Sequence, residues 1–371
     1  MTKAAELAKM GEVLTNGQIG GRRNIIINGA MNVAQRATSA TGLGATSGYY
    51  VVDRVNFGHS GNSAGRYTAT QESITDLGGF NNALKLACTT ADTSIASDEW
   101  ERLVFNLEAQ DLQSLRFGNS DAKKFTVSFY VKGNASATYT LGAQSADSNR
   151  WMAKTFNVTT SWNRVSVTFE ADTSGAINDD TGHGIVLYIT LQAGSDRTSG
   201  EIPSTWETLS AADTADSNQT MFFDSTDRTF FITGLQMEVG SQATPFEHRS
   251  FGEELILCQR YFNIFGTDTS NNYENFGIAV AFSTGTGDIR LGPIPMPVTM
   301  RAIPTVAHSG AFACLGQLNF GTLSSIGLAD GGSPTNVMLN ITGNQSQTGG
   351  NVSPFRSNND ADAFLSFDAE L

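Results

Sequence analysis

The feature that most constrains the fold is a two-residue alternation of apolar and polar side chains that recurs along the chain. Residues 125–132, 165–170 and 185–191 all show it. Successive side chains of a β-strand point to opposite faces, so each stretch predicts a strand with one buried face. Loops rich in Asn, Asp, Ser, Thr and Gly separate the stretches, and no spacing of strand, long helix and strand appears. The pattern predicts an antiparallel β-sandwich rather than a parallel sheet.

Length and composition agree with an all-β chain of more than one domain. The 371 residues are 40% hydrophobic and 16% charged, so the chain can build globular cores. Domain sizes of about 100–200 residues imply two or three such units. There are 38 glycines against 8 prolines, and the charged fraction is low. These values favour many turns and little helix.

The charge and the apolar pattern exclude two classes of partner. The net charge is -13 and the pI is near 4.7. A phosphate backbone is bound by clustered Lys and Arg, so we expect no nucleic-acid partner. No apolar run is long enough to cross a bilayer, and the sequence MTKAAELAKMGE at the N-terminus has no secretory signal core. We expect the protein to assemble in a cytoplasm and not to insert into a membrane.

The cysteines and histidines do not form a recognisable metal or disulfide pattern. Cys88, Cys258 and Cys314 are far apart, which predicts buried thiols. The four histidines are scattered, and for His248 a hydrogen bond to backbone near a helix start is the simpler role. Residues 178–180, Asn-Asp-Asp, fit either a calcium loop or an ordinary polar turn, and the turn is preferred. We therefore expect no metal and no other cofactor.

Enzyme motifs are also missing from the sequence. A glycan-cleaving site needs two carboxylates across a sugar linkage, and nothing marks such a pair. Asp98, Glu99 and Glu101 surround Trp100, an arrangement that we interpret as a solvated loop around one buried ring. No GxSxG elbow, P-loop or zinc-protease motif is present. We predict that the protein is not an enzyme.

Sugar binding needs only an aromatic face and planar polar groups. Trp151 follows the polar turn Asn149-Arg150 and is the best candidate platform, with Arg150 and Asn149 as polar neighbours. Structural packing of Trp151 is the alternative. For Trp162, which precedes an alternating strand, core packing is the preferred role.

Residues 222–265 contain the clearest local signals. A strand pattern changes phase at Thr233-Gly234, which predicts a β-bulge. Ser250 and Glu253 have the spacing of a capping box. A short helix should follow within residues 250–265, with Leu255, Cys258 and Phe262 on its apolar face and Glu253, Glu254 and Arg260 toward solvent. Further on, the prolines of residues 291–306 place that run at a sheet edge or on the surface.

The first fifty residues suggest assembly. Leu7 and Met10 could share one side of a short helix, which needs neighbours to be stable. The run Ile25-Ile26-Ile27 can pair as a strand only if both faces are covered. Identical copies around an axis could supply that cover, and an edge strand folded onto its own domain is the alternative.

Several long phrases resemble a known family. The phrases GEVLTNGQIGGRRNIIINGAMNVAQR (11–36), YYVVDR (49–54) and ITGLQMEVGSQATPFEHRSFGEELILCQRYF (232–262) resemble virion fibre proteins of tailed bacteriophages. The strands VSFYVKG (127–133) and SWNRVSVTFEA (161–171) resemble those of jelly-roll carbohydrate-binding modules. The resemblance implies a homotrimer that binds host cell-surface glycan and joins other phage tail or capsid proteins through its N-terminal segment.

The sequence therefore predicts an all-β protein with four parts. These are an attachment and trimerisation segment (1–48), a jelly-roll-like sandwich (49–249), a helical hinge (250–265) and a smaller C-terminal β tip (266–371). The predicted function is host recognition and adsorption as a phage tail fibre located in the virion. A capsid decoration or head fibre is one alternative, and a glycan depolymerase is another.

Overall fold

The chain is divided into two compact units, Met1–Glu254 and Leu255–Leu371. The computed structural model describes residues 23–61, 63–266, 270–281, 289–314, 323–329, 332–343 and 348–371. Each unit is built almost entirely from antiparallel strands around its own hydrophobic core. The predicted all-β class is confirmed.

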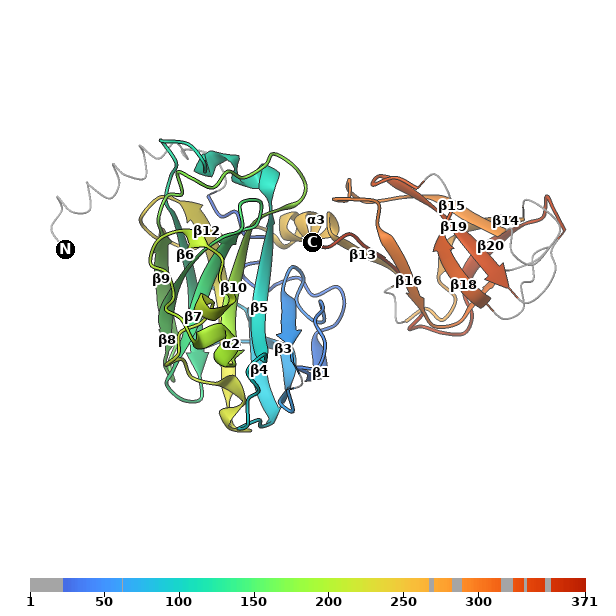
Figure 1. The fold of residues 1–371 in the computed structure, drawn as a ribbon. Coiled ribbons are helices and arrows are strands. Elements are labelled where there is room, and N and C mark those ends of the chain that lie inside the picture. Colours follow the sequence, from blue (N-terminus) through green and yellow to red (C-terminus); the bar gives the residue numbers. More distant parts are fainter. Residues whose placement is uncertain are drawn as a thin grey trace. The chain divides into compact units, whose positions relative to one another are not determined.

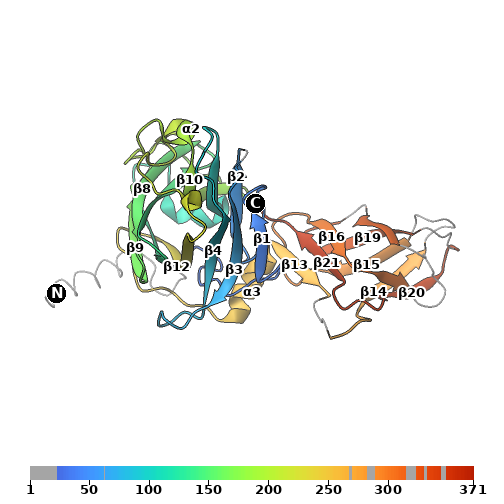
Figure 2. The same ribbon diagram turned by 90° about the horizontal axis from the view of Figure 1, so that it is seen from below.

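Two six-stranded sheets form the N-terminal unit. The first sheet, in spatial order, contains β1 (Ser39–Leu43), β3 (Arg66–Ser73), β4 (Asn82–Thr90), β12 (Thr229–Val239), β6 (Phe125–Gly133) and β9 (Asn163–Phe169). The second contains β11 (Glu207–Thr208), β8 (Arg150–Val158), β7 (Ala137–Ser145), β10 (His183–Ala193), β5 (Trp100–Glu108) and β2 (Asn56–Ser60). Figures 1 and 2 show the sheets as two stacked layers.

The core lies between these layers because the alternating apolar faces point inward. In β6, Phe125, Val127, Phe129 and Val131 are all fully buried. The inward residues of β9 and β10 join the same cluster. This confirms the predicted faces, and it makes burial of apolar area the main force that holds the sheets together.

Short helices occupy the connections of this unit. They are η1 (Ala109–Leu115), α2 (Ser195–Thr198), η2 (Ala211–Asp213) and η3 (Phe222–Asp224). In both ribbon views α2 lies on the outer side of the sheet that contains β10 and β8. The second face of that sheet is therefore covered by chain from the same unit.

The predicted bulge is present in β12. The strand pairs with β4 only up to Ile232, and its register with β6 shifts between Thr233 and Gln236. Gly234 has a φ of +64°, a backbone conformation that glycine adopts without strain. The extra residue explains why the apolar phase of the sequence changes at this point.

The capping box is confirmed, but the helix that follows is shorter than predicted. Ser250 N donates to Glu253 Oε2 at 3.1 Å, and Glu253 N donates to Ser250 Oγ at 3.3 Å. Helix α3 (Phe251–Gln259) then ends, and Phe262–Phe265 form strand β13 instead of a further turn. Cys258 is fully buried as expected, whereas Leu255 is only half-buried.

The C-terminal unit also contains two antiparallel sheets. One holds β13, β21 (Phe364–Asp368) and β16 (Thr305–Ser309). The other holds β17 (Phe312–Cys314), β20 (Val352–Ser357), β14 (Asn275–Ala281), β15 (Ile289–Pro295), β19 (Asn336–Gly343) and β18 (Leu323–Leu328).

The prediction for the proline-rich run is wrong in part. Strand β15 is not at an edge but lies between β14 and β19. It pairs with β14 only from Ile289 to Leu291, and its register with β19 shifts between Leu291 and Ile294. Pro293 falls inside that irregularity, where a ladder hydrogen bond is already missing, so the sheet tolerates it.

Candidate functional site

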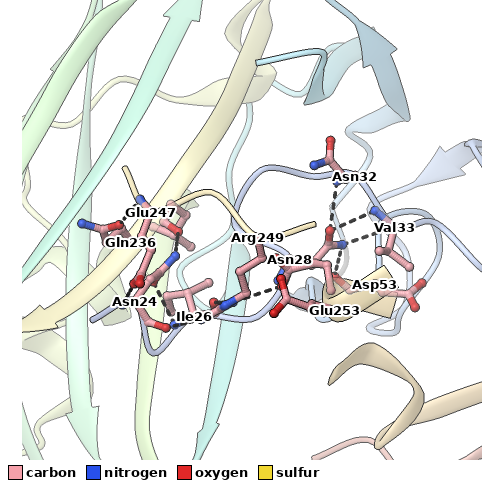
Figure 3. Close-up of polar contacts among 12 residues, drawn as sticks. Asn24, Ile26, Asn28, Asn32, Val33, Asp53, Gln236, Glu247, Arg249 and Glu253 are labelled. Carbon is pink, nitrogen blue, oxygen red and sulfur yellow. Dashed lines mark hydrogen bonds and ion pairs between the residues drawn. The ribbon is translucent and has the colours of Figure 1, made fainter. Parts of the chain in front are cut away.

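The three phrases that resemble fibre proteins meet in space. The segment that begins at Arg23 lies against the end of β12 and the chain that follows it (Figure 3). Glu247 Oε2 accepts hydrogen bonds from the backbone N of Arg23 at 2.7 Å and of Asn24 at 2.8 Å. The Ile25 N donates to the Met237 O at 2.9 Å. Segments more than 200 residues apart in sequence therefore form one packed structure.

Asn28 organises the turn that follows. Its Oδ1 accepts from the backbone N of Asn32 and of Val33, both at 2.9 Å. Its Nδ2 donates to the carbonyls of Val33 at 2.8 Å and Asp53 at 2.9 Å. All four hydrogen-bonding positions of the side-chain amide are used, which holds the turn rigidly (Figure 3). Asp53 belongs to the second phrase, residues 49–54, so Asn28 joins that phrase to the first.

A buried ion pair closes the same region. Arg249 Nη1 lies 3.1 Å from Glu254 Oε1, and both side chains are more than nine-tenths buried. Arg249 also donates to the carbonyls of Asn24 and Ile26, and Glu254 accepts from the backbone N of Asn28. The prediction that Glu254 faces solvent is therefore wrong, because a buried carboxylate here satisfies backbone donors that would otherwise lack partners.

Gly29 allows the closest approach of the segment to β12. The Leu235 N donates to the Gly29 O at 2.9 Å. A Cβ at position 29 would lie 2.0 Å from the Leu235 O, which no side chain could tolerate. The glycine is required by this contact rather than by an unusual φ.

A pocket of about 420 Å³ opens beside this structure. It is bounded by the N-terminal segment, by the connection between β3 and β4, and by the chain leading into α3. Its lining includes Asn32, Phe80, Asn81, Asn82, His248 and Phe251. Its size is within the range of small-ligand sites, which are about 300–1,000 Å³.

Aromatic rings form one side of the pocket. The ring of Phe80 is buried and lies 5.2 Å from His248 and 5.1 Å from Phe246, measured between centroids. Phe251 at the start of α3 is 58% exposed. Phe80 is thus held in place by its neighbours, whereas the Phe251 ring is available to a ligand. The expected backbone hydrogen bond of His248 is not found among the described residues, and its imidazole packs on rings instead.

Side-chain amides supply the polar part. Asn82 Nδ2 donates to Asn32 Oδ1 at 3.1 Å, which orients both groups. Asn81 is exposed, and its backbone carbonyl accepts a hydrogen bond from the Ile74 N. Amides next to an aromatic ring can bind hydroxyl groups while the ring contacts an apolar face. This combination suits an uncharged, hydroxyl-rich ligand.

The sugar platform predicted at Trp151 is wrong. Trp151 is 1% exposed, and its Nε1 donates to the Asp213 O at 3.2 Å. Its six-membered ring lies so close to Gly142 that a Cβ there would be 1.9 Å away. The alternative role of Trp151, structural packing, is the correct one, because a buried ring has no face that a sugar could contact.

The predicted polar neighbours of Trp151 are also structural. Arg150 Nε donates to Asp172 Oδ2 at 2.6 Å. Asn149 is exposed in a turn with a φ of +50°. The structure brings Arg150 and Asn149 next to each other at the start of β8, but not into a binding surface with Trp151. Trp162 is half-buried and donates to Asp76 Oδ1 at 2.9 Å.

The isoleucine run is covered by its own unit. Ile26 is 4% exposed and belongs to the sandwich core, while Ile25 and Ile27 are half-buried. The cover that symmetry mates were expected to supply comes from the same chain, as in the alternative, but residues 25–27 do not form the strand that both interpretations expected. Leu7 and Met10 lie outside the described residues.

The acidic cluster around Trp100 is not a solvated loop. Glu99 and Glu101 are 3% and 2% exposed. Glu101 Oε1 accepts from the Tyr67 hydroxyl at 2.6 Å, and Oε2 lies 3.3 Å from His59 Nδ1. Burial raises the pKa of Glu101. The hydrogen bond between His59 and Glu101 raises the pKa of His59. Both oxygens of Glu101 are engaged inside the sandwich, which gives this carboxylate a structural role.

The predicted turn at residues 178–180 is observed. Asp180 Oδ1 accepts from the Gly182 N at 2.8 Å, and Asn178 donates to Asp147. Among the described residues no group of three or more His, Cys, Asp or Glu side chains could hold a metal ion. No helix in the described part of the chain is long and apolar enough to cross a membrane.

Sequence reasoning missed the pocket because its residues come from three separate segments. The only local signal was the asparagine pair before β4, Asn81-Asn82, which follows Phe80. Such a triplet is common in ordinary turns. The triplet lines a pocket only because tertiary packing brings Asn32 and Phe251 next to it.

Comparisons with known proteins find similarity in structure alone. No protein-family model matches the chain, and no curated protein matches it in sequence. A CBM4 structure is 14% identical with a TM-score of 0.28, and covers 58% of this chain and 99% of that one. A family 61 module, TmCBM61, in complex with β-1,4-galactotriose is 9% identical with a TM-score of 0.30, and covers 59% of this chain and 99% of that one.

A phage protein is among the similar structures. The enzymatically active domain of tailspike protein 4 from bacteriophage CBA120 is 10% identical with a TM-score of 0.27. The match covers 58% of this chain and 21% of that one. Likenesses at these TM-scores carry no inference about function. The antiparallel sandwich rests on the strand pairing of the chain itself.

Proposed function

We propose that the protein is a non-enzymatic adhesion protein of a phage virion, a homotrimeric tail fibre that binds glycan on the host surface. The pocket that combines the exposed Phe251 ring with the Asn32, Asn81 and Asn82 amides carries the proposal. Its chemistry suits a neutral sugar. Its position also supports the proposal, because the pocket is built where the fibre-like phrases pack together.

The mechanism is multivalent attachment. A half-open pocket with one available ring makes few contacts, so a single site is weak. Three sites on one trimer, repeated around a particle, turn later binding events into intramolecular ones and raise the overall avidity by about 10²–10⁴. No strong individual site is needed.

The test is binding of the purified full chain to host cells and to isolated host surface polysaccharide. Phe251→Ala and Asn81→Ala should weaken binding, since both side chains are exposed and neither change opens the core. Ile256→Ala is the matched control, because Ile256 is 54% exposed on the same helix and does not line the pocket. Equal binding by Phe251→Ala and Ile256→Ala would exclude the pocket as the receptor site.

Four further measurements separate the alternatives. Imaging the protein on intact particles distinguishes a tail fibre from a capsid decoration or head fibre. Particles stripped of a tail fibre lose adsorption, whereas loss of a decoration protein affects capsid stability alone. Release of reducing ends from the polysaccharide would reveal a depolymerase. Analytical ultracentrifugation tests the trimer, and a lone monomer would contradict it.

A further inference from the structure

The outer face of the second sheet contains a buried, unpaired arginine. Arg102 on β5 points away from the core, since its neighbour Leu103 is buried inside the sandwich. Residues 194–221 cover this face, and Thr140 on β7 is in hydrogen-bond contact with Gln219 of the covering segment. Arg102 is 7% exposed, although it is charged.

Arg102 has little direct compensation for this burial. Its Nη2 donates to Thr214 Oγ1 at 2.9 Å, whereas its Nε has no hydrogen-bond partner among the described residues. The guanidinium lies 4.8 Å from the Trp100 ring centroid and 5.4 Å from that of Tyr188. Cation–π contacts stabilise the charge in part, but a buried cation normally also has an anionic partner.

No carboxylate of the described chain provides that partner. Burial lowers the pKa of Arg102 to about 10, with Tyr188 acting in the opposite direction and Arg197 in the same direction as burial. Among the described residues, no Asp or Glu side chain contributes to the pKa of Arg102, although the protein as a whole is acidic.

Arg197 provides a second cation at the same place. It lies in α2, and its backbone O accepts from the Ala215 N at 3.0 Å, next to the Thr214 that contacts Arg102. The Arg197 Nε is buried without a partner in the described part of the chain. Thr190 stands opposite Arg102 in the sheet register, and its hydroxyl is also buried and unpartnered there.

The two guanidinium Nε atoms are unused donors, and the Thr190 hydroxyl can donate as well. Water could accept from any one of them. Because these donors belong to two cationic groups that have no carboxylate partner among the described residues, an anionic acceptor should bind here more strongly than a neutral one. We propose that Arg102 and Arg197 form a binding site for one small anionic group, such as a halide, a phosphate or a carboxylate. This site is independent of the neutral-sugar pocket.

The anionic group has two possible sources, a free ion or an acidic substituent of a larger ligand. Thermal unfolding of the full chain is measured in sodium bromide, sodium phosphate and sodium gluconate at constant ionic strength, and then with an acidic oligosaccharide. A free-ion site gives a saturable rise in melting temperature with bromide or phosphate. A site for a substituent responds to the oligosaccharide but not to the free ions.

Two variants make the test specific. Arg197→Gln should raise the half-saturating concentration about tenfold, equivalent to about 1.4 kcal/mol, because it removes one of the two charges. Arg102→Met should abolish saturation. Arg116→Gln is the control, because Arg116 is 55% exposed and pairs with Asp121 elsewhere on the surface. Wild-type response in Arg197→Gln, or no saturable rise with any of these anions or with the acidic oligosaccharide, would overturn the proposal and leave water on these donors.

Discussion

The Tyr67 hydroxyl donates to Glu101 Oε1 at 2.6 Å across the interior of the sandwich. Tyr67 lies on β3 of one sheet and Glu101 on β5 of the other, and the two residues are 1% and 2% exposed. His59 on β2 contacts the second carboxylate oxygen. Glu101 therefore joins the two sheets through Tyr67, and within its own sheet it contacts His59 on the neighbouring strand β2.

Removing the Tyr67 hydroxyl should destabilise the fold. Tyr67→Phe leaves the ring in place but removes a hydrogen bond to a buried carboxylate, which costs about 1.5–3 kcal/mol. Chemical denaturation followed by tryptophan fluorescence measures this change. Tyr273→Phe is the control, because Tyr273 is 43% exposed and its hydroxyl makes one long contact with Asn359. Equal effects of the two changes would show that the Glu101 contact adds no stability.

Stability should fall as the pH rises above 6.5, the pKa of histidine in the unfolded chain, and His59 should be responsible. The pKa of His59 is raised by its hydrogen bond to Glu101 above the unfolded value of 6.5. A raised pKa means that the folded state holds the proton more tightly. The stabilisation is complete below the unfolded pKa and disappears as the pH passes the folded one.

The raised pKa of Glu101 acts with the same sign at lower pH, so the two effects do not cancel. The pKa of Tyr67 is raised well above its usual value, so its hydroxyl remains protonated in this range. Urea midpoints between about pH 6 and pH 9 should decrease for the wild type and change less for His59→Gln. A parallel decrease in both proteins would assign the effect to other groups.

The Arg249–Glu254 pair should contribute far more than a surface pair. Arg249→Met leaves the buried Glu254 carboxylate without its cation and should cost about 3–5 kcal/mol. Arg116→Met breaks the Arg116–Asp121 pair, whose side chains are about half exposed, and should cost at most about 1 kcal/mol. Denaturation midpoints compare the two. A small loss of stability in Arg249→Met would mean that residues 23–28 stay packed against the end of β12 without this ion pair.

Glycan binding should depend weakly on salt. The chain carries a net charge of -13, so long-range steering toward an acidic bacterial surface is repulsive. Attachment then relies on short-range ring and amide contacts, which salt does not screen. Binding isotherms at low and high sodium chloride should nearly coincide, and binding that collapses at high salt would contradict the proposed mode.

Local sequence patterns predicted the strands well because the information is local. The alternation in residues 125–131 reports which side chains face the core, and the phase change at Gly234 reports a bulge. The Ser250–Glu253 capping box spans one turn of chain. Each of these features depends on neighbours within a few residues, so no knowledge of the tertiary fold was needed.

Predictions that depended on long-range cover failed. Trp151 beside a polar turn suggested an exposed ring, and the run at Ile25–Ile27 suggested cover by identical copies. Residues 194–221 cover Trp151 instead, and the end of β12 covers the isoleucine run. Glu254 was assigned to solvent because its partners, Arg249 and the Asn28 N, come from the preceding turn and from the far N-terminal segment. Periodicity cannot reveal a partner that lies 226 residues away.

The sequence by itself determined that the chain is all-β, acidic and antiparallel, since strand periodicity and charge are properties of consecutive residues. Only the tertiary structure decided where the candidate binding surfaces lie. The pocket beside Phe251 and the unpaired charge of Arg102 both arise from contacts between distant segments, and burial, which sets the energy of a ring or a charge, exists only after those segments have packed.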